Sequence, residues 1–406
     1  AAQTAVALEG SYFCMKGPLV AWASLQPRWE LRDASLPNIT WFAPRTINDE
    51  EKSDLLINQL RQDMPFEANF SSFWSDVYNF GKQITRIARL TLMAEEYGQE
   101  DLVHQGVSIL EHNLTPWLLG KNDDSFQYET QWGGLVTTYG EDGEYLDYGN
   151  AYYNDHHFHY GYFLYSFAVL IKYKPSFYDQ HEKQINLIKN DIVNQNSSSQ
   201  LFPLSRHKDF FDFHSWASGL HNSWDGKNQE SISEAVNAYY GVYLFGLATG
   251  DQKFADWGQI LLSMELSAGK LYWHMTDASD IYGEPFSSNK MVGQVAENSA
   301  RYRTWFGIDP QYIHCVNMLP FTPITELLMT KSFVTEEYPV LASQLSNFTD
   351  GGRHPEKLGP WMSFVYMDLA VTDPVLAYNI IANHTSVEFD VGNSLSNTYY
   401  WIFTRP

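Results

Sequence analysis

Most of the chain repeats apolar positions with the period of an α-helix. Ile84, Ile87 and Leu92 recur at helical spacing, and the apolar stripe stops at Gly98, as expected where a helix ends. The same signal predicts further helices along the chain. Their approximate ranges are 50–64, 103–116, 160–173, 182–193, 231–249, 253–268, 322–330, 335–347 and 362–382.

Sequential helices with no alternating strand pattern between them favour antiparallel helical hairpins. We therefore expect a mainly α fold in which six hairpins close into an (α/α)6 toroid barrel over residues 48–406. Residues 1–47 differ, because four prolines between positions 18 and 44 interrupt short apolar runs and favour turns and extended chain. We expect them to form a small N-terminal appendage, either α/β or irregular.

Three long segments separate the predicted helical pairs, and they are rich in Gly, Asp, His, Trp and Tyr. They span residues 121–158, 194–229 and 269–300. Loops longer than about 15 residues in a compact domain are usually functional. We expect these segments to form one face of the barrel and to carry its functional site.

The charge balance restricts the partners of the protein. Lys and Arg number 26 against 48 Asp and Glu, which gives a net charge of −22. A field of this sign repels phosphate backbones and anionic lipids, so we expect neither nucleic acid nor membrane as a partner. Aromatic residues make up 16% of the chain. They indicate either a ligand such as a sugar, whose C–H faces stack on rings, or an aromatic-rich core.

The densest polar and aromatic stretch is AYYNDHHFHYGYFLY, where Asp155 precedes an apolar helix. Two interpretations of Asp155 stay open. It is a carboxylic acid whose pKa is adjusted for proton donation, or it is the N-cap of the helix. A metal site is not expected, because His156 and His157 point in different directions on a regular backbone and only one of them with His159 approaches ligand spacing.

A second concentration of polar residues contains Glu230 and Glu234, four positions apart at the start of a predicted helix that carries almost no other charge. This spacing places both on one face, and the lack of cations suggests burial toward a cleft; exposed glutamates on a capped helix are the alternative. Together with Asp155 they supply what glycosidic hydrolysis requires. One carboxylic acid protonates the leaving oxygen, and one carboxylate activates water or attacks carbon.

Motifs of several other enzyme classes are absent from the sequence. It contains no GxSxG elbow, no P-loop and no HExxH, and Cys14 and Cys315 are too far apart for a zinc or redox motif. Tryptophans in or beside the candidate loops would suit a cleft as stacking platforms, although some belong to the core. They are Trp132, Trp216, Trp224, Trp273 and Trp305.

Several long blocks also carry a resemblance to a known family. They are YNDHHFHYGYFLY, FPLSRHKDFFDFHSWASGL and DGKNQESISEAVNAYYGVYLFGLATGD, with the shorter YWHM, NKMVG and MLPFTPITELL. In these blocks the chain resembles glycoside hydrolase family 81, the endo-β-1,3-glucanases of fungi and some bacteria. The resemblance implies endo-hydrolysis of β-1,3-glucan (laminarin, curdlan or cell-wall glucan) with inversion of the anomeric configuration and without a cofactor.

The resemblance also implies roles for particular residues. Asp155 is the expected general acid, and either Glu230 or Glu234 is the expected base, with the choice between them left open. The residues expected to bind substrate are Tyr153, His159, His214, Trp216 and Lys227. Lys227 has three readings: a hydrogen bond to sugar hydroxyls, a cation that lowers a carboxylate pKa, or an ordinary loop lysine.

The chain departs from the family in one respect. Family members normally carry a large N-terminal β-sandwich and a small α/β domain before the barrel, and this chain begins too late to contain the sandwich. The resemblance therefore implies a fragment, a processed form or a shortened member, with residues 1–47 as a remnant of the α/β linker domain.

Two other functions stay open: a non-catalytic glucan-binding protein, and a polysaccharide lyase on the same toroid. The negative charge disfavours an anionic polymer as substrate. We expect a monomer, and six N-x-S/T sequons favour a protein that is secreted or held in the cell wall. They begin at Asn38, Asn69, Asn113, Asn196, Asn347 and Asn383.

Overall fold

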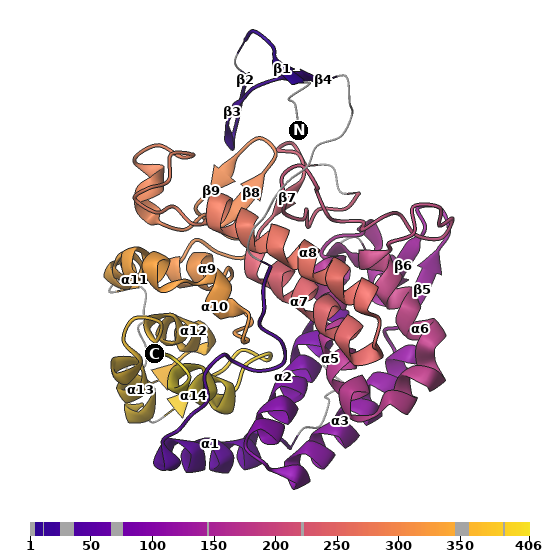
Figure 1. Ribbon diagram of the computed structural model, residues 1–406, viewed down its shortest axis with the longest axis vertical. Helices are drawn as coiled ribbons and strands as arrows, with labels where there is room; N and C mark the ends of the chain where they lie inside the picture. The colour runs from indigo at the N-terminus through magenta and orange to yellow at the C-terminus, as the bar shows by residue number, and fades with distance from the viewer. Residues whose placement is uncertain are drawn as a thin grey trace.

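The computed structural model describes residues 5–10, 12–24, 36–65, 76–143, 146–220, 223–345, 357–384 and 386–406. It is mainly helical, as the sequence predicts (Figure 1). The longer helices are α1 (Glu50–Asp63), α2 (Val77–Glu96), α3 (Glu100–Leu118), α5 (His156–Tyr173), α6 (Pro175–Val193), α7 (Ile232–Thr249), α8 (Gln252–Ala268), α11 (Lys331–Leu345), α12 (Pro360–Leu369), α13 (Pro374–Asn383) and α14 (Leu395–Phe403).

Short helical turns and strands occupy the connections. The turns are α4 (Thr138–Asp142), η1 (Leu146–Tyr152), η2 (Gly269–Trp273), η3 (Phe286–Asn289), α9 (Pro310–Cys315) and α10 (Thr325–Leu328). Antiparallel pairs join β1 (Ala5–Ala7) to β4 (Trp22–Ser24), β2 (Tyr12–Cys14) to β3 (Gly17–Leu19), β5 (Phe126–Glu129) to β6 (Gly134–Thr137), and β8 (Gln294–Ala296) to both β7 (Asn228–Gln229) and β9 (Ala300–Arg301). A parallel pair joins β10 (Lys357–Leu358) to β11 (Ser386–Val387).

Successive long helices pack against one another around the molecule. α2 packs on α3, α5 on α6 and α7 on α8, while α2, α5 and α7 also pack side by side. In Figure 1 the colours follow this course, and the yellow α14 returns beside the indigo α1. Since α14 contacts both α1 and α2, the first and last helices meet.

The centre of the helical body is the contact between α5 and α7. Nearly every residue of both helices is buried, which matches their almost uncharged sequences. Gly161 permits the close approach, because a Cβ there would come within 2.5 Å of the Ala238 side chain. This contact fixes the N-terminal ends of α5 and α7 relative to each other, where Asp155 and Glu234 lie.

Two predicted helices differ from the observed ones for reasons that involve proline. The range 362–382 is two helices, α12 and α13, because Pro374 occupies the first turn of a new helix that Asp373 caps. The range 103–116 is shorter than the observed α3, which continues through Pro116 to Leu118. Pro116 falls within the last turn of α3, where the helix is already ending.

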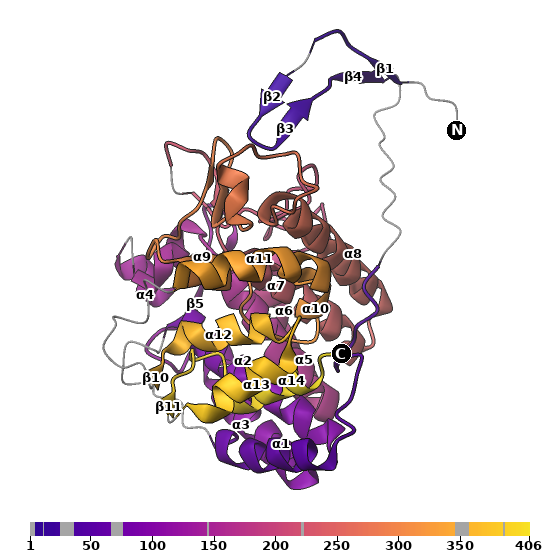
Figure 2. The ribbon, with the colours of Figure 1, turned by 90° about the vertical axis from the view of Figure 1, so that its left-hand side faces the viewer.

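The N-terminal part of the chain has two portions. Residues 5–10 and 12–24 contain the short paired strands that project from the helical body (Figure 2). Residues 36–47, by contrast, run along the helices and bury Ile39, Ala43 and Ile47 in the main core. The domain boundary between residues 47 and 48 stays a prediction.

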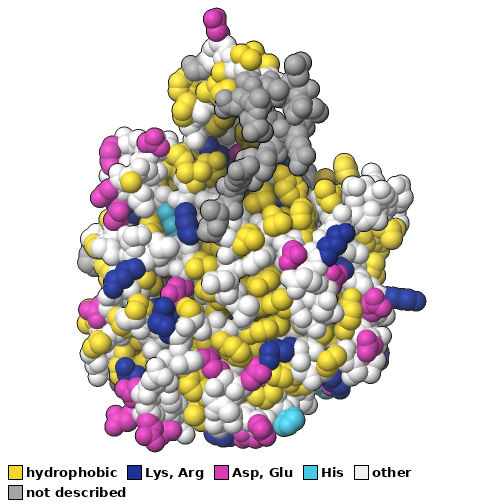
Figure 3. Space-filling model, viewed as in Figure 1, with side chains coloured by type: hydrophobic (Ala, Val, Ile, Leu, Met, Phe, Trp, Pro, Cys, Tyr) yellow, Lys and Arg dark blue, Asp and Glu magenta, His cyan; other side chains and the backbone are white. Residues whose placement is uncertain are grey.

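The described helices can be compared with the requirements for a membrane span, and one face of the molecule shows how its acidic side chains are distributed (Figure 3). Within the described ranges, no helix has the length and apolar composition that crossing a bilayer requires. The acidic side chains on the face in Figure 3 are dispersed rather than gathered in one place. On this face the acidic side chains that contribute to the net charge of −22 therefore do not form one patch for a cationic partner.

Candidate active site

A cleft of about 740 Å³ opens at the N-terminal ends of α2, α5 and α7. Asp155, Glu230 and Glu234, the predicted catalytic residues, all line it. Aromatic rings make up much of the remaining wall. They belong to Tyr78, Tyr148, Phe158, Trp224, Trp305 and Phe306.

Asp155 occupies the N-cap position of α5 but does not cap the helix. Its backbone is left-handed, with φ of 60°, and its side chain makes no capping hydrogen bond; aspartate tolerates this conformation better than most residues. The Asp155 N–H donates to the Ala217 carbonyl at 2.9 Å, which anchors the turn. The carboxyl group is thus left for the cleft, where it is partly exposed.

The environment of Asp155 favours the protonated acid. Removal from water raises its pKa to about 8, and the nearby charge of Glu234 acts in the same direction. No described residue donates a hydrogen bond that would stabilise the carboxylate. At neutral pH the Asp155 carboxyl therefore retains its proton, as a general acid requires.

Glu230 lies just before α7 and is partly exposed to the cleft. Its Oε1 accepts the backbone N–H of Trp305 at 2.9 Å, and its own carbonyl accepts the indole N–H of Trp273 at 3.0 Å. Burial, together with the charges of Asp155 and Glu234, raises the pKa of Glu230 to about 8, and the hydrogen bond from Trp305 acts against this shift. The Trp305 N–H is the contact that favours the ionised form.

Glu234 lies on the first turn of α7 and is only 5% exposed. Its Oε1 accepts the hydroxyls of Tyr162 at 2.6 Å and Tyr78 at 3.0 Å. Burial raises the pKa of Glu234, while the charge of Lys82 opposes this shift. The two phenols hold the carboxyl group in one orientation.

Charge on one acid of the cleft affects the titration of another. The charge of Glu234 raises the pKa of Asp155, and the charges of Asp155 and Glu234 raise that of Glu230. Ionisation of one acid therefore disfavours ionisation of another. The cleft can therefore hold one carboxylic acid and one carboxylate at the same time, which is the requirement for acid and base catalysis at one bond.

His159 is one of the predicted substrate-binding residues, and it lines the cleft. Its ring stacks on Tyr78 with 4.9 Å between the ring centroids. Burial lowers the pKa of His159 well below its usual range. The ring is therefore neutral, and it supports the wall of the cleft beside the three acids.

Tyr153 lies behind the cleft instead of lining it. It is 2% exposed, its hydroxyl donates to Glu129 at 2.9 Å, and the Arg206 guanidinium lies over its ring. These contacts attach the turn before Asp155 to the β5–β6 hairpin. A direct contact between Tyr153 and substrate stays a prediction.

His214 and Trp216 are buried and also lie outside the cleft lining. The His214 Nε2 is 2.7 Å from the Lys16 ammonium, and the Trp216 indole donates to Asp209 at 3.0 Å. Lys227 is exposed, with its backbone N–H donating to Glu297 at 3.0 Å. The assignment of these residues to substrate binding stays a prediction.

Comparison with known proteins identifies the family. The chain matches the model of the glycosyl hydrolase family 81 C-terminal domain over residues 47–403. The chain belongs to glycosyl hydrolase family 81. This confirms the resemblance carried by the blocks around Asp155 and Glu230.

Curated relatives of this family 81 chain have been named for one activity. It is 33% identical over 376 residues to a glucan endo-1,3-beta-D-glucosidase of Glycine max, covering 90% of this chain and 54% of the relative. It is 31% identical over 329 residues to the primary septum glucan endo-1,3-beta-D-glucosidase of Schizosaccharomyces pombe, covering 80% of this chain and 31% of the relative. The chain thus spans about half, or less, of the length of these relatives.

A solved structure has the same fold. The family 81 chain superposes on a glycoside hydrolase family 81 protein of Clostridium thermocellum, CtLam81A, determined as a point mutant, with a TM-score of 0.76 and 26% identity. The match covers 98% of this chain and 53% of that one. The described helices therefore follow an architecture known in the family.

The cleft of this family 81 chain uses two of the five tryptophans singled out in the sequence. Trp224 is 84% exposed and Trp305 is 59% exposed, and both line the cleft. Trp273 is fully buried in the core. Trp132 is exposed on the β5–β6 connection but is not part of the cleft lining.

Sequence reasoning did not single out four aromatic residues of the cleft: Tyr78, Tyr148, Phe158 and Phe306. Tyr78 begins α2 as Glu234 begins α7, so its position in a first turn is a signal that could have found it. Tyr148 lies in a left-handed run with Asp147 and Gly149, whose φ angles are between 49° and 78°. No local sequence signal identifies such a run, because only Gly149 favours it intrinsically.

The long segments predicted to carry the site do so unequally. The segments 121–158 and 194–229 contribute lining residues, among them Asp155 and Trp224. The third segment, 269–300, contributes none of the described lining, and its place is taken by Trp305 and Phe306 just beyond it. The end of this segment forms the paired strands β8 and β9, and the chain reaches the cleft only after β9.

Metal ligands and cysteines add little to this site. Across the residues that the structure describes, no group of three or more His, Cys, Asp or Glu is arranged to hold a metal ion. Cys14 is exposed, Cys315 is buried and both thiols are free. The expectation that the family 81 chain works without a cofactor stays a prediction.

Proposed function

We propose that this chain hydrolyses internal β-1,3-glucosidic bonds of β-1,3-glucan, such as laminarin, curdlan or cell-wall glucan, by an inverting mechanism. One observation carries the proposal: three carboxyl groups with raised pKa values meet in a single aromatic-lined cleft. Membership of family 81 and relatives named glucan endo-1,3-beta-D-glucosidase support the choice of substrate.

Asp155 acts as the general acid. Its pKa of about 8 keeps the proton in place at neutral pH, and its carboxyl group is partly exposed to the cleft. It gives this proton to the glycosidic oxygen as the bond to the anomeric carbon breaks. The leaving sugar thus departs as a neutral alcohol.

Glu230 acts as the general base, although its pKa is raised as far as that of Asp155; the Trp305 N–H, a contact that Asp155 lacks, favours its ionised form. It is partly exposed, one of its oxygens is held by the Trp305 N–H, and no described residue hydrogen-bonds to the other oxygen. That second oxygen is free to take a proton from a water molecule as the water attacks the anomeric carbon. An inverting enzyme needs roughly 6.5 to 9.5 Å between the two carboxyl groups to admit this water.

Glu234 acts as a positioning residue. It is 5% exposed and both Tyr162 and Tyr78 donate to it, so it has little access to a water molecule. Its charge raises the pKa of Asp155 and of Glu230. We assign to Glu234 the role of keeping the proton on the acid.

The wall of the cleft suits a neutral glucan. Trp224 and Trp305 are exposed rings in the cleft, and the C–H faces of glucose units stack on such rings. A neutral polymer is not repelled by a protein with a net charge of −22, whereas a polyuronate is. This argues for a hydrolase of glucan over a lyase.

We propose that the helical hairpins close into an (α/α)6 toroid, with the cleft at one end of the ring. The sequential helix pairs and the contact of α14 with α1 and α2 support this closure. The residues 48–406 would then constitute the catalytic barrel.

We also propose a secreted or cell-wall monomer. Asn38, Asn196 and Asn383 are exposed, so their sequons are accessible to glycosylation. Asn113 is 4% exposed within α3 and donates to the Ile109 carbonyl, which makes it unsuitable. The sequons at Asn69 and Asn347 lie outside the described residues.

Digestion of defined polysaccharides tests this function. The full chain should release reducing ends and a ladder of oligosaccharides from laminarin and curdlan, and none from a β-1,4-glucan. Glucan binding without release of reducing ends would instead indicate a non-catalytic binding protein. An absorbance rise from an unsaturated product on a polyuronate would indicate a lyase, and either result would overturn the proposal.

A further inference from the structure

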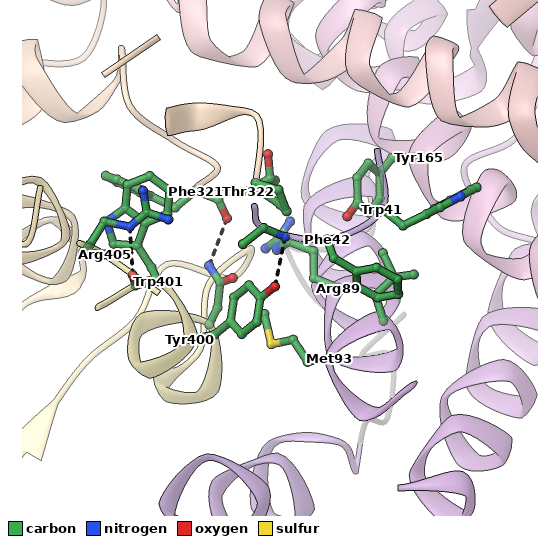
Figure 4. A pocket seen from close by; sticks show the side chains of 14 residues that line it. Trp41, Phe42, Arg89, Met93, Tyr165, Phe321, Thr322, Tyr400, Trp401 and Arg405 are labelled. Carbon is green, nitrogen blue, oxygen red and sulfur yellow. Dashed lines mark hydrogen bonds between the residues drawn. The ribbon is translucent and has the colours of Figure 1, made fainter. Parts of the chain in front are cut away.

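A second cavity lies away from the cleft, where α14 packs beside α2 (Figure 4). Its volume is about 20 Å³, enough for one water molecule or one small ion. Five polar residues of its lining come from four parts of the chain. They are Arg89, Tyr165, Thr322, Tyr400 and Arg405.

Arg89 brings a buried positive charge to this cavity. It lies on α2 and is 2% exposed. Its Nη2 donates to the Gly392 carbonyl, but its Nε and Nη1 have no hydrogen-bond partner among the described residues. The charge of Asp390 favours the charged form of Arg89, but the Asp390 carboxylate pairs with Lys82 at 2.7 Å and not with Arg89.

Tyr165 brings a second unused donor. It lies on α5, is 2% exposed, and its hydroxyl has no hydrogen-bond partner in the described structure. In Figure 4 it lies with Arg89 on one side of the cavity, facing α14 and the segment that contains Thr322. Two helices thus direct unpaired donors toward the same space.

Several other polar groups of the cavity wall are already engaged. Tyr400 accepts the Ala43 N–H at 3.1 Å and donates to Glu96 at 2.7 Å. Thr322 donates to Asn237 at 2.7 Å, and Arg405 pairs with Glu326 at 2.9 Å. Among the described lining residues, Arg89 and Tyr165 are those with a fully buried donor that has no partner.

A buried cation without a counter-ion is strongly unfavourable, and buried donors without acceptors add to the cost. A water molecule would accept hydrogen bonds but would leave the charge of Arg89 uncompensated. A small anion does both. We propose that this cavity binds one monovalent anion of chloride size, held by the guanidinium of Arg89 and the hydroxyl of Tyr165.

The position of this anion gives it a structural role. Arg89 lies eleven residues after Tyr78 on α2, about 16 Å along the helix axis, so the anion is remote from the cleft. It joins α2 and α5 to the side of the cavity formed by α14. It therefore stabilises the contact between the first and last parts of the helical body.

Thermal unfolding of the full chain tests the site. Chloride should raise the Tm by about 2 to 5 °C between 1 and 100 mM, with ionic strength held constant by gluconate, which is too large to enter. Arg89→Met should abolish this dependence. Tyr165→Phe should retain it but require severalfold more chloride, while Arg61→Met, a change at an exposed arginine, should behave as wild type.

Crystals soaked in bromide provide a direct measurement. An anomalous peak should lie in the cavity beside Arg89, and it should weaken in Tyr165→Phe. This variant removes one hydroxyl and keeps the ring, so it gives an answer even if Arg89→Met does not fold. Equal Tm values in chloride and gluconate, a chloride effect unchanged in both cavity variants, or a cavity without bromide would each overturn the proposal.

Discussion

Two buried polar regions share the helices α2 and α5, and their charges are opposite. At the cleft, Asp155 begins α5 and Tyr78 near the start of α2 donates to Glu234. Farther along the same helices, Arg89 and Tyr165 face the small cavity. The first region has an excess of carboxyl groups, and the second contains Arg89, whose guanidinium has no paired carboxylate among the described residues.

The two regions differ in which molecules can reach their polar groups. The cleft is open, so water and substrate reach Asp155 and Glu230, which are partly exposed. The cavity holds about 20 Å³, so only a small ion can provide compensation there. The acids of the cleft are thus accessible to a substrate, whereas an anion bound in the cavity would stabilise the packing of the helices.

The largest expected effect comes from removing the acid of the cleft. Asp155→Asn should lower kcat on laminarin by about a thousandfold or more, because the leaving oxygen loses its proton donor. Binding of laminarin should change little, and Asp256→Asn at an exposed site on α8 serves as the control. Turnover within tenfold of wild type would remove Asp155 from the acid role.

The two glutamates should respond differently to substitution. Glu230→Ala should lower kcat by about a thousandfold, and azide should restore part of the activity by replacing the activated water. Glu234→Ala should cost less, about ten- to a hundredfold, and should gain nothing from azide, since Glu234 does not activate the attacking water. Azide rescue confined to the Glu234 variant would exchange the two roles.

The raised pKa of Asp155 should also make the stability of the protein depend on pH. The pKa of Asp155 is raised to about 8 in the folded chain and is about 3.9 when unfolded. Its contribution is therefore fully present below about pH 4 and is lost as the pH rises toward 8. Asp155→Asn removes this loss, so its Tm should match wild type near pH 4 and exceed it by a few degrees at pH 9.

A wild-type Tm above that of Asp155→Asn at pH 9 would contradict this account. Such a result would mean that the carboxylate is stabilised in the fold rather than strained there. Asp256→Asn again provides the control, because no burial acts on that exposed side chain.

The smallest expected effect concerns the stacking platform. Trp305→Ala should raise KM for laminarin about three- to tenfold through the loss of one ring contact. It should leave kcat nearly unchanged, because the hydrogen bond to Glu230 comes from the backbone N–H. Trp132→Ala is the matched control, since Trp132 is 58% exposed against 59% for Trp305 but lies outside the cleft. Equal KM changes in both variants would exclude stacking on Trp305.

Local signals account for what the sequence could predict of the fold. The helix α8 lies close to its predicted range of 253–268, and α2 ends just before the predicted stop at Gly98, because apolar stripes and end signals are local. The break at Pro374 was missed, since apolar residues continue on both sides of it. The β5–β6 hairpin inside the segment 121–158 was also missed, although Gly133 and Gly134 are a turn signal, because its two strands are only 4 residues long.

For the site, unusual context was the useful signal. Asp155, Glu230 and Glu234 are acids beside nearly uncharged helices, and the structure brings all three to one cleft. Arg89 gave no comparable signal, because an arginine on an amphipathic helix normally faces water. Only tertiary contacts show that it is buried.

Proton NMR of laminarin during digestion tests the central claim most directly. If Asp155 and Glu230 deliver a proton and a water from opposite faces of the sugar, the first reducing ends should appear as the α-anomer and then relax by mutarotation to the mixture. Initial formation of the β-anomer would show retention and would contradict the account.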